Sequence, residues 1–149
     1  RGFSALQLTH VEVDFSGPDP GPLAAIDTAR IESTLRTRVE ARLREVGIRL
    51  APGAAPGVVQ MRMRLAGLRY GDPVRGGTGE TLRRQIRLQT LGIEGIFRDS
   101  ETGEVLAVVL TRPRGATSVA ERWSEMEDVL DLFARNFARE VAAERNRVD

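Results

Sequence analysis

The chain has 149 residues, of which 41% are hydrophobic and 29% charged, and this length and composition suit one globular domain with its own core. The absence of cysteine excludes a disulfide framework, thiolate metal ligation and a thiol nucleophile, and the single histidine excludes a multi-histidine metal site. All 22 basic residues are arginine, but 21 acidic residues leave a formal net charge of +1, which argues against the positive field of a general nucleic-acid-binding protein. No apolar run approaches the ~20 residues that span a membrane, so the sequence predicts a single globular domain over residues 1–149 without a transmembrane segment.

The first predicted element is a strand over residues 6–15. Apolar residues alternate along it in two phases, with a slip at Thr9 and His10 that predicts a bulge or bend. Residues 17–22 follow as a stiff loop, because its prolines fix φ and exclude regular structure.

The second predicted element is an amphipathic helix over residues 28–46. Apolar residues recur there every three or four positions, with arginines and glutamates on the other faces. We expect Asp27 or Thr28 to cap the start of this helix and Gly47 to end it.

A half-buried strand is predicted over residues 59–65. Its apolar residues alternate with polar ones that include Arg62 and Arg64, so one face of the strand should be wet and basic. Residues 70–85 are rich in glycine and predict a long mobile loop, and whether the stretch 71–81 has a function stays open.

A hairpin is predicted from two β-favouring runs, residues 86–98 and 104–112. In the polar turn between them, Asp99 can accept hydrogen bonds from backbone amides and Gly103 suits the left-handed position. Both faces of the second run are apolar, so we expect this strand to lie inside the sheet or beneath helices.

A long C-terminal helix is predicted over residues 119–144, opened by a capping box from Ser118 to Glu121. Its apolar stripe is interpreted as core and consists of Trp123, Met126, Leu130, Phe133, Phe137 and Val141. Together the elements predict an α+β fold, with an antiparallel or mixed sheet of about four strands and two long helices packed mainly on one face.

The sequence shows no catalytic, cofactor or metal constellation. His10 stands alone, and the aspartates lack the spacing of a metal-binding loop. The glycine-rich stretch 76–81 is no phosphate cradle, because Glu80 stands where such a loop needs a lysine. We therefore predict no catalytic residue, no metal and no cofactor.

One candidate partner-binding surface remains, formed by basic residues of the second strand and of the glycine-rich loop. Its members are Arg62, Arg64, Tyr70, Arg83, Arg84 and Arg87. Arginine suits phosphate and carboxylate groups, but Tyr70 is the only nearby ring, so the stacking platform of single-strand binders is missing. An ordinary charged surface is the simpler interpretation of the same residues.

The chain resembles an uncharacterised bacterial family of predicted secreted lipoproteins that carry a domain of unknown function. The resemblance lies in the Asp-Ser-x-Thr-Gly-Glu turn that begins at Asp99, in Trp123 after a polar linker, and in the helical segment 132–138. It implies export through the inner membrane and, if a lipidated cysteine stood before Arg1, anchoring at a periplasmic membrane face. Since the chain does not begin with methionine, we expect that a signal segment preceded it.

These observations lead to one functional hypothesis and two alternatives. We favour a non-enzymatic periplasmic envelope protein that binds a protein or an envelope component through a sheet edge, the basic strand face or the glycine-rich loop. A small hydrolase or ligand-binding enzyme that uses Asp and Arg side chains is the first alternative. An Arg-mediated nucleic-acid-binding module is the second, although no nucleic acid is expected as a partner.

Overall fold

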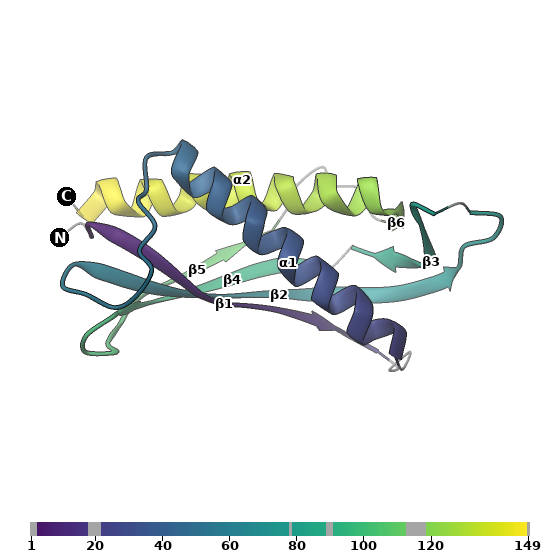
Figure 1. The fold of residues 1–149 in the computed structure, drawn as a ribbon, viewed down its shortest axis with the longest axis horizontal. Coiled ribbons are helices and arrows are strands. Elements are labelled where there is room, and N and C mark those ends of the chain that lie inside the picture. The colour runs from purple at the N-terminus through teal and green to yellow at the C-terminus, as the bar shows by residue number, and fades with distance from the viewer. Residues whose placement is uncertain (1–2, 18–21, 78, 89–90, 113–118, 149) are drawn as a thin grey trace.

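The computed structural model describes residues 3–17, 22–77, 79–88, 91–112 and 119–148 (Figure 1). The helices and strands in chain order are β1 (Ala5–Phe15), α1 (Pro22–Glu45), β2 (Val58–Pro73), β3 (Thr81–Arg87), β4 (Gly92–Asp99), β5 (Val105–Thr111), β6 (Val119–Arg122) and α2 (Trp123–Val148). Both helices lie on the same face of one mixed sheet, which confirms the predicted α+β class and the one-sided helix layer.

The sheet is built around the long strand β2. Strand β1 pairs with it in parallel, and β1 and β2 are joined through α1. On the other side of β2, β4 pairs antiparallel with residues 59–66 and β3 with residues 69–73, so β3 and β4 follow one another along the same strand. Strand β5 then pairs with β4, and β6 with β3, both antiparallel.

The described chain therefore has six strands, not about four, and the difference has a simple cause. The sheet has four rows of backbone, because β3 with β4 and β5 with β6 each make up one interrupted row. The two strands missing from the prediction are β3, most of which the sequence predicts as part of the loop 70–85, and β6, which it predicts as the start of the C-terminal helix.

The predicted loop over residues 70–85 is wrong at both ends. Strand β2 continues to Pro73 and β3 begins at Thr81, so most of this segment is a hairpin. The amide of Val74 donates to the carbonyl of Arg83 at 2.9 Å and extends the pairing beyond the named strands. Glycine and charged residues make the segment look like a loop, although cross-strand pairing holds it extended.

The first helix begins earlier than predicted. It starts at Pro22, a residue whose fixed φ suits the first helical position, so Asp27 and Thr28 lie inside the helix and do not cap it. Its end agrees with the prediction: the amide of Gly47 donates to the carbonyl of Arg44 at 3.0 Å, and that of Ile48 to the carbonyl of Leu43 at 3.0 Å. These two bonds form the Schellman arrangement of a helix C-terminus.

The start of α2 also differs from the prediction. Ser118 lies outside the described residues, and residues 119–122 form β6, so Glu121 belongs to a strand and α2 begins at Trp123. A carboxylate still serves the helix start, because the Glu125 side chain accepts a hydrogen bond from the Glu121 amide at 3.2 Å. The short strand β6 thus takes the place of the expected capping box.

The core lies between the helices and the sheet. All six residues of the predicted α2 stripe are buried, which confirms that this stripe is core. Phe137 lies directly over Gly95 of β4, where a β-carbon would come within 2.6 Å of the phenyl ring. Only glycine at this position allows α2 to pack so close to the sheet.

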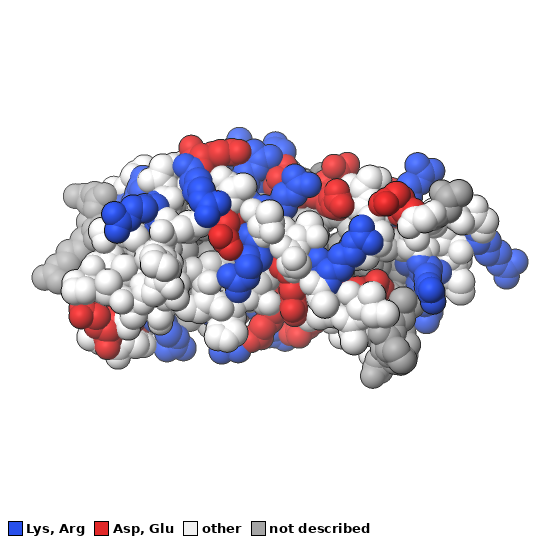
Figure 2. Space-filling model, in the orientation of Figure 1, with Lys and Arg blue, Asp and Glu red and all other residues white. Residues whose placement is uncertain are grey.

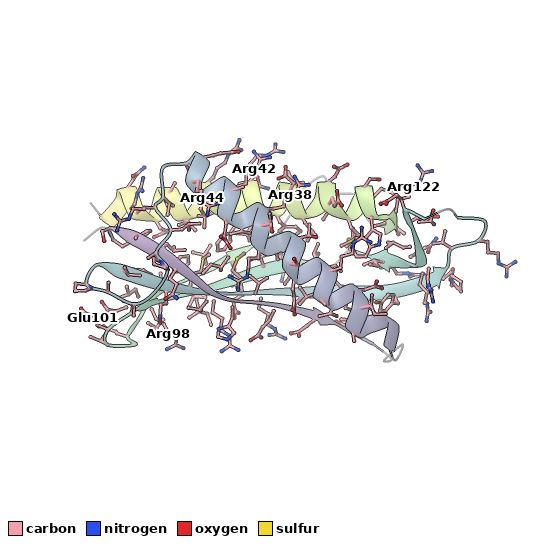
Figure 3. All side chains as sticks on the ribbon, viewed as in Figure 1. Arg38, Arg42, Arg44, Arg98, Glu101 and Arg122 are labelled. Atoms are coloured by element: carbon pink, nitrogen blue, oxygen red, sulfur yellow. The ribbon has the colours of Figure 1, made fainter. Side chains whose placement is uncertain are left out.

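A network of ion pairs joins the exposed sides of the two helices. The Arg42 guanidinium of α1 contacts both carboxylate oxygens of Asp131 of α2, at 3.2 and 2.5 Å, and Arg38 and Arg135 lie within 4 Å of the same carboxylate. In Figure 3, Arg38 and Arg42 lie on the part of α1 that crosses α2. The hydrogen bond from Arg42 lowers the pKa of Asp131.

Asp131→Asn is expected to lower the free energy of unfolding at neutral pH by about 1 kcal/mol, because the pair is only partly shielded from water. Since the folded pKa of Asp131 is depressed, its contribution is present above the unfolded pKa of about 3.9 and is lost as the pH falls through the folded pKa. The variant should therefore show a flatter loss of stability below about pH 4 in urea unfolding. Asp128→Asn, at an exposed site of the same helix, is the control and should behave as the parent does.

Candidate interaction surface

The outer strands β1 and β5 differ in how their backbone edges are covered. At β1, Leu6 forms two backbone hydrogen bonds on the side away from β2. Its amide donates to the Arg49 carbonyl at 2.8 Å, and its carbonyl accepts from the Ala51 amide at 2.9 Å. Segment 49–51 thus covers the first part of this edge.

Side chains of α1 cover the next part of β1. The Arg36 guanidinium donates to the carbonyls of Leu8 at 2.9 Å and Thr9 at 3.3 Å. The Glu32 carboxylate accepts a hydrogen bond from the Val13 amide at 3.2 Å. The register shift between Leu8 and His10 confirms the predicted bulge, and the Leu8 and Thr9 carbonyls at this shift are the ones that Arg36 binds. A blocked edge of this kind cannot accept another strand.

Strand β5, at the opposite side of the sheet, has no such cover among the described residues. It pairs with β4 on one side only, and no described strand or side chain bonds to its other side. The prediction that this strand lies inside the sheet is therefore wrong, and the alternative, that it lies beneath helices, holds only for its inner face, which contacts α2. Its inner residues Ala107 and Val109 do pack against the core, but its outer residues lie on the face without helices.

The outer side chains of β5 form the largest exposed apolar row of the described chain. Leu106 is 51% exposed, Val108 55% and Leu110 73%. Ile96 of β4 lies beside Val108 and widens the row. Figure 3 shows Arg98, at the end of β4, on the side of the sheet that faces away from the helices. The outer side chains of β5 lie on this same face. We call Leu106, Val108 and Leu110, with the unpaired backbone edge of β5, the β5 edge.

A shallow groove of about 220 Å³ adjoins the β5 edge. It is lined by Arg64, Ala66, Gly67, Gly92, Ile93, Glu94, Leu110, Thr111 and Arg112. The Thr111 hydroxyl is buried and has no hydrogen-bond partner among the described residues. An unpaired buried hydroxyl costs about 1–3 kcal/mol, which an incoming polar group would relieve.

The basic face predicted for β2 is neutralised by β1. Arg62 forms an ion pair with Glu12, and Arg64 with Asp14, so carboxylates of the parallel strand accompany both guanidiniums. The hydrogen bond with Asp14 raises the pKa of Arg64. Figure 2 likewise shows basic and acidic side chains interspersed over the face that α1 crosses.

The six residues of the predicted partner-binding surface lie on two faces. Tyr70 and Arg84 belong to the helix side, where the guanidinium lies 5.9 Å from the centre of the phenol ring. Arg62 and Arg64 belong to the opposite face and are exposed, and so are Arg83 and Arg87, which alternate with the inward-facing residues of β3. The structure thus does not gather them into one patch, and a binding role for them stays a prediction.

Tyr70 is held between the sheet and the start of α1. Its ring stacks on Phe15 with 4.5 Å between the centroids, and its hydroxyl donates to the Asp27 carboxylate at 2.6 Å. Asp27 is the one buried charged residue of the described chain, at 8% exposure. Burial, and then the hydrogen bond to Asp27, raises the pKa of Tyr70 well above its usual value of about 10. The contact fastens α1 to the end of β2.

Alkaline titration should show this fastening directly, because Tyr70 is the only tyrosine. Neutral Tyr70 stabilises the fold fully below its unfolded pKa, and this contribution is lost as the pH rises from that value through the raised folded pKa. Tyrosinate absorbance should therefore appear only together with unfolding, which the fluorescence of Trp123 measures. Asp27→Ala should move the ionisation of Tyr70 to lower pH. A reversible titration of Tyr70 with its midpoint near pH 10 in the folded parent would contradict this account.

The described residues hold no other arrangement with evident chemistry. His10 is exposed on β1, and no group of three or more His, Cys, Asp or Glu side chains within the described ranges could hold a metal ion. None of the helices described is long and apolar enough to cross a membrane. The fold and surface thus define an α+β structure in which the β1 edge is covered and the β5 edge has no cover from the described residues.

Comparison with known proteins places this fold. No protein-family model matches the sequence, and no curated protein matches it. A putative lipoprotein from Caulobacter crescentus matches over 93% of this chain and 92% of its own, with a TM-score of 0.51 and 13% identity. A putative neuraminyllactose-binding hemagglutinin homolog from Helicobacter pylori matches over 98% and 92%, with a TM-score of 0.54 and 8% identity. These likenesses show a shared fold.

Proposed function

We propose that this chain is a non-enzymatic binding protein of the bacterial cell envelope, which holds a protein partner by adding a strand to the β5 edge. The observation that carries the proposal is the contrast between the two edges of the sheet. Proteins cover or charge an exposed edge strand to prevent pairing with other chains, as β1 is covered here. An apolar edge left open fits the use of that edge for binding.

The chemistry of the β5 edge fits a protein partner better than the alternatives. Strand addition supplies main-chain hydrogen bonds, and the row of Leu106, Val108 and Leu110 supplies apolar contact. Nucleic acid would need free cationic groups, whereas Arg62 and Arg64 are already paired with carboxylates. The envelope location is supported by the fold shared with a putative lipoprotein and by the resemblance of the turn and the Trp123 helix to secreted lipoproteins.

Site-specific photocrosslinking in the native host, with the natural precursor, tests this function. A photoreactive residue at Leu110 should give a discrete product in the envelope fraction, and Val108→Glu should abolish it by placing a charge on the edge. Arg44, exposed on α1, is the matched control site and should give no such product. Recovery of the protein in the cytosol, or equal products from both sites, would contradict the proposal.

A further inference from the structure

The sequence around β5 has a two-fold pattern that suggests one particular occupant. The strand itself carries no charge, and it is bounded by Glu104 on one side and Arg112 on the other, both exposed. The centre of this segment is Val108. When two such segments run antiparallel about Val108, Glu104 of each lies opposite Arg112 of the other. We propose that the β5 edge binds the β5 edge of a second copy of this chain, antiparallel, with the two-fold axis at Val108.

The side chains match in the same register. On the outer face, Val108 meets Val108 of the second copy, and Leu106 meets Leu110 at both ends. On the inner face, Ala107 meets Val109. Directly opposed residues of antiparallel strands have Cβ atoms about 4.5–5.5 Å apart, so these apolar residues would cover one another. Three strongly exposed side chains in each copy would thereby leave water.

Charge selects the antiparallel direction. A parallel arrangement in register would place Glu104 against Glu104 and Arg112 against Arg112, which is unfavourable. The antiparallel one forms two Glu–Arg pairs instead. The charges of the neighbouring strand fit the same arrangement. Glu94 of β4 lies beside Leu110, and Arg98 lies beside Val105. The two-fold axis therefore brings Glu94 of one copy to the same end as Arg98 of the other.

The covered edge of β1 limits the assembly to two copies. Head-to-tail pairing of β5 with β1 would extend into a filament, since each new copy would offer a free edge. Segment 49–51 and the side chains of Glu32 and Arg36 occupy that edge. Pairing of β5 with β5 uses an edge that no described residue covers in either copy, and the resulting pair is closed.

This inference rests on the proposed function, since both assign binding to the β5 edge. The test uses purified protein in sedimentation equilibrium up to roughly 1 mM, a range that detects weak dimers. The parent should shift from its mass of 16.4 kDa towards twice that value. Val108→Glu and Val108→Lys each place like charges face to face at the two-fold axis, and each should weaken the dimer at least about tenfold.

An equimolar mixture of the two variants is the decisive sample. Only a symmetric pair places residue 108 against itself, so the mixture should regain a dimer of one Glu and one Lys copy. Circular dichroism establishes that both variants are folded, as expected for an exposed position. Ile26→Glu, at another exposed apolar residue on α1, is the matched control and should dimerise as the parent does.

Three results would overturn the inference. These are a parent that stays monomeric over the whole range, a parent dimer that tolerates both Val108 variants, and variants that fail to associate when mixed. The proposed function would survive them if photocrosslinks from Leu110 still join a protein of different sequence in the envelope fraction. The opposite result is that those crosslinks are lost, while the parent still dimerises and the mixed Val108 variants regain the dimer. That result would contradict the proposed function alone.

Discussion

Gly95→Ala is expected to lower the free energy of unfolding by about 3 kcal/mol, because it forces a β-carbon into a filled core. A β-carbon at residue 95 would lie 2.6 Å from Cζ of Phe137 and 2.9 Å from Cε1. The ring cannot easily move, since Phe137 is fully buried and stacks near Phe97 with 6.4 Å between centroids. Urea unfolding followed by the fluorescence of Trp123, the only tryptophan, measures the change.

Gly92→Ala provides the matched control for this prediction. Gly92 lies at the start of the same strand, but a β-carbon there would meet nothing closer than 3.7 Å. Its stability should change by less than about 1 kcal/mol. Phe137→Leu should recover part of the loss in Gly95→Ala by removing ring atoms. Equal effects of alanine at residues 92 and 95 would show that α2 does not pack on β4 as described.

Tyr70→Ala is the second substitution with a large expected effect, a loss of about 3–5 kcal/mol. It removes the ring that stacks on Phe15 and leaves the buried Asp27 carboxylate without its hydrogen bond. Tyr70→Phe separates the two contributions, because it keeps the stacked ring and removes only the hydroxyl. We expect Tyr70→Phe to cost about 1–3 kcal/mol in the same urea measurement.

The location of the loss is also testable, because Tyr70 fastens the start of α1 to β2. Hydrogen exchange in Tyr70→Ala should increase first in the N-terminal half of α1. The end of α1 near Arg42 should change less, since Asp131 of α2 holds it. A uniform increase over the whole chain would contradict a local fastening role.

Local periodicity explains what the sequence predicts well. The apolar stripes of both helices, the bulge near Thr9 and the Asp99 turn all depend on residues that are close along the chain. In the turn, one Asp99 carboxylate oxygen accepts the amides of Glu101 at 2.8 Å and Thr102 at 2.9 Å, and Gly103 takes the left-handed φ of 76°. Each of these features could be assigned before the fold was known.

Long-range pairing explains what the sequence does not predict. The partners of Arg62 and Arg64 are carboxylates on a strand 50 residues earlier, and only the parallel register of β1 and β2 brings them together. Strand β5 is apolar on both faces, as a central strand would be, and nothing in its own residues shows that it lies at an edge. The candidate surface therefore depends on the strand order of the sheet, which the sequence does not predict.

The two edges of the sheet lead to one account of the molecule. The fold uses Arg36, Glu32 and segment 49–51 to close the β1 edge, and it leaves β5 apolar and open among the described residues. The proposal of binding by strand addition rests on that asymmetry, and the proposal of self-pairing rests on the charges at both ends of β5. Both proposals require that the outer amides of β5 are free in the isolated chain.

Hydrogen exchange of the β5 amides, measured by NMR in dilute and concentrated samples, tests this requirement most directly. In dilute protein, amides bonded to β4 should exchange slowly, whereas those on the outer side of residues 105–111 should exchange rapidly. At high concentration the outer amides should become protected too, and Val108→Glu should prevent this. Slow exchange of every β5 amide in the dilute sample would show that the edge is already covered and would contradict the account.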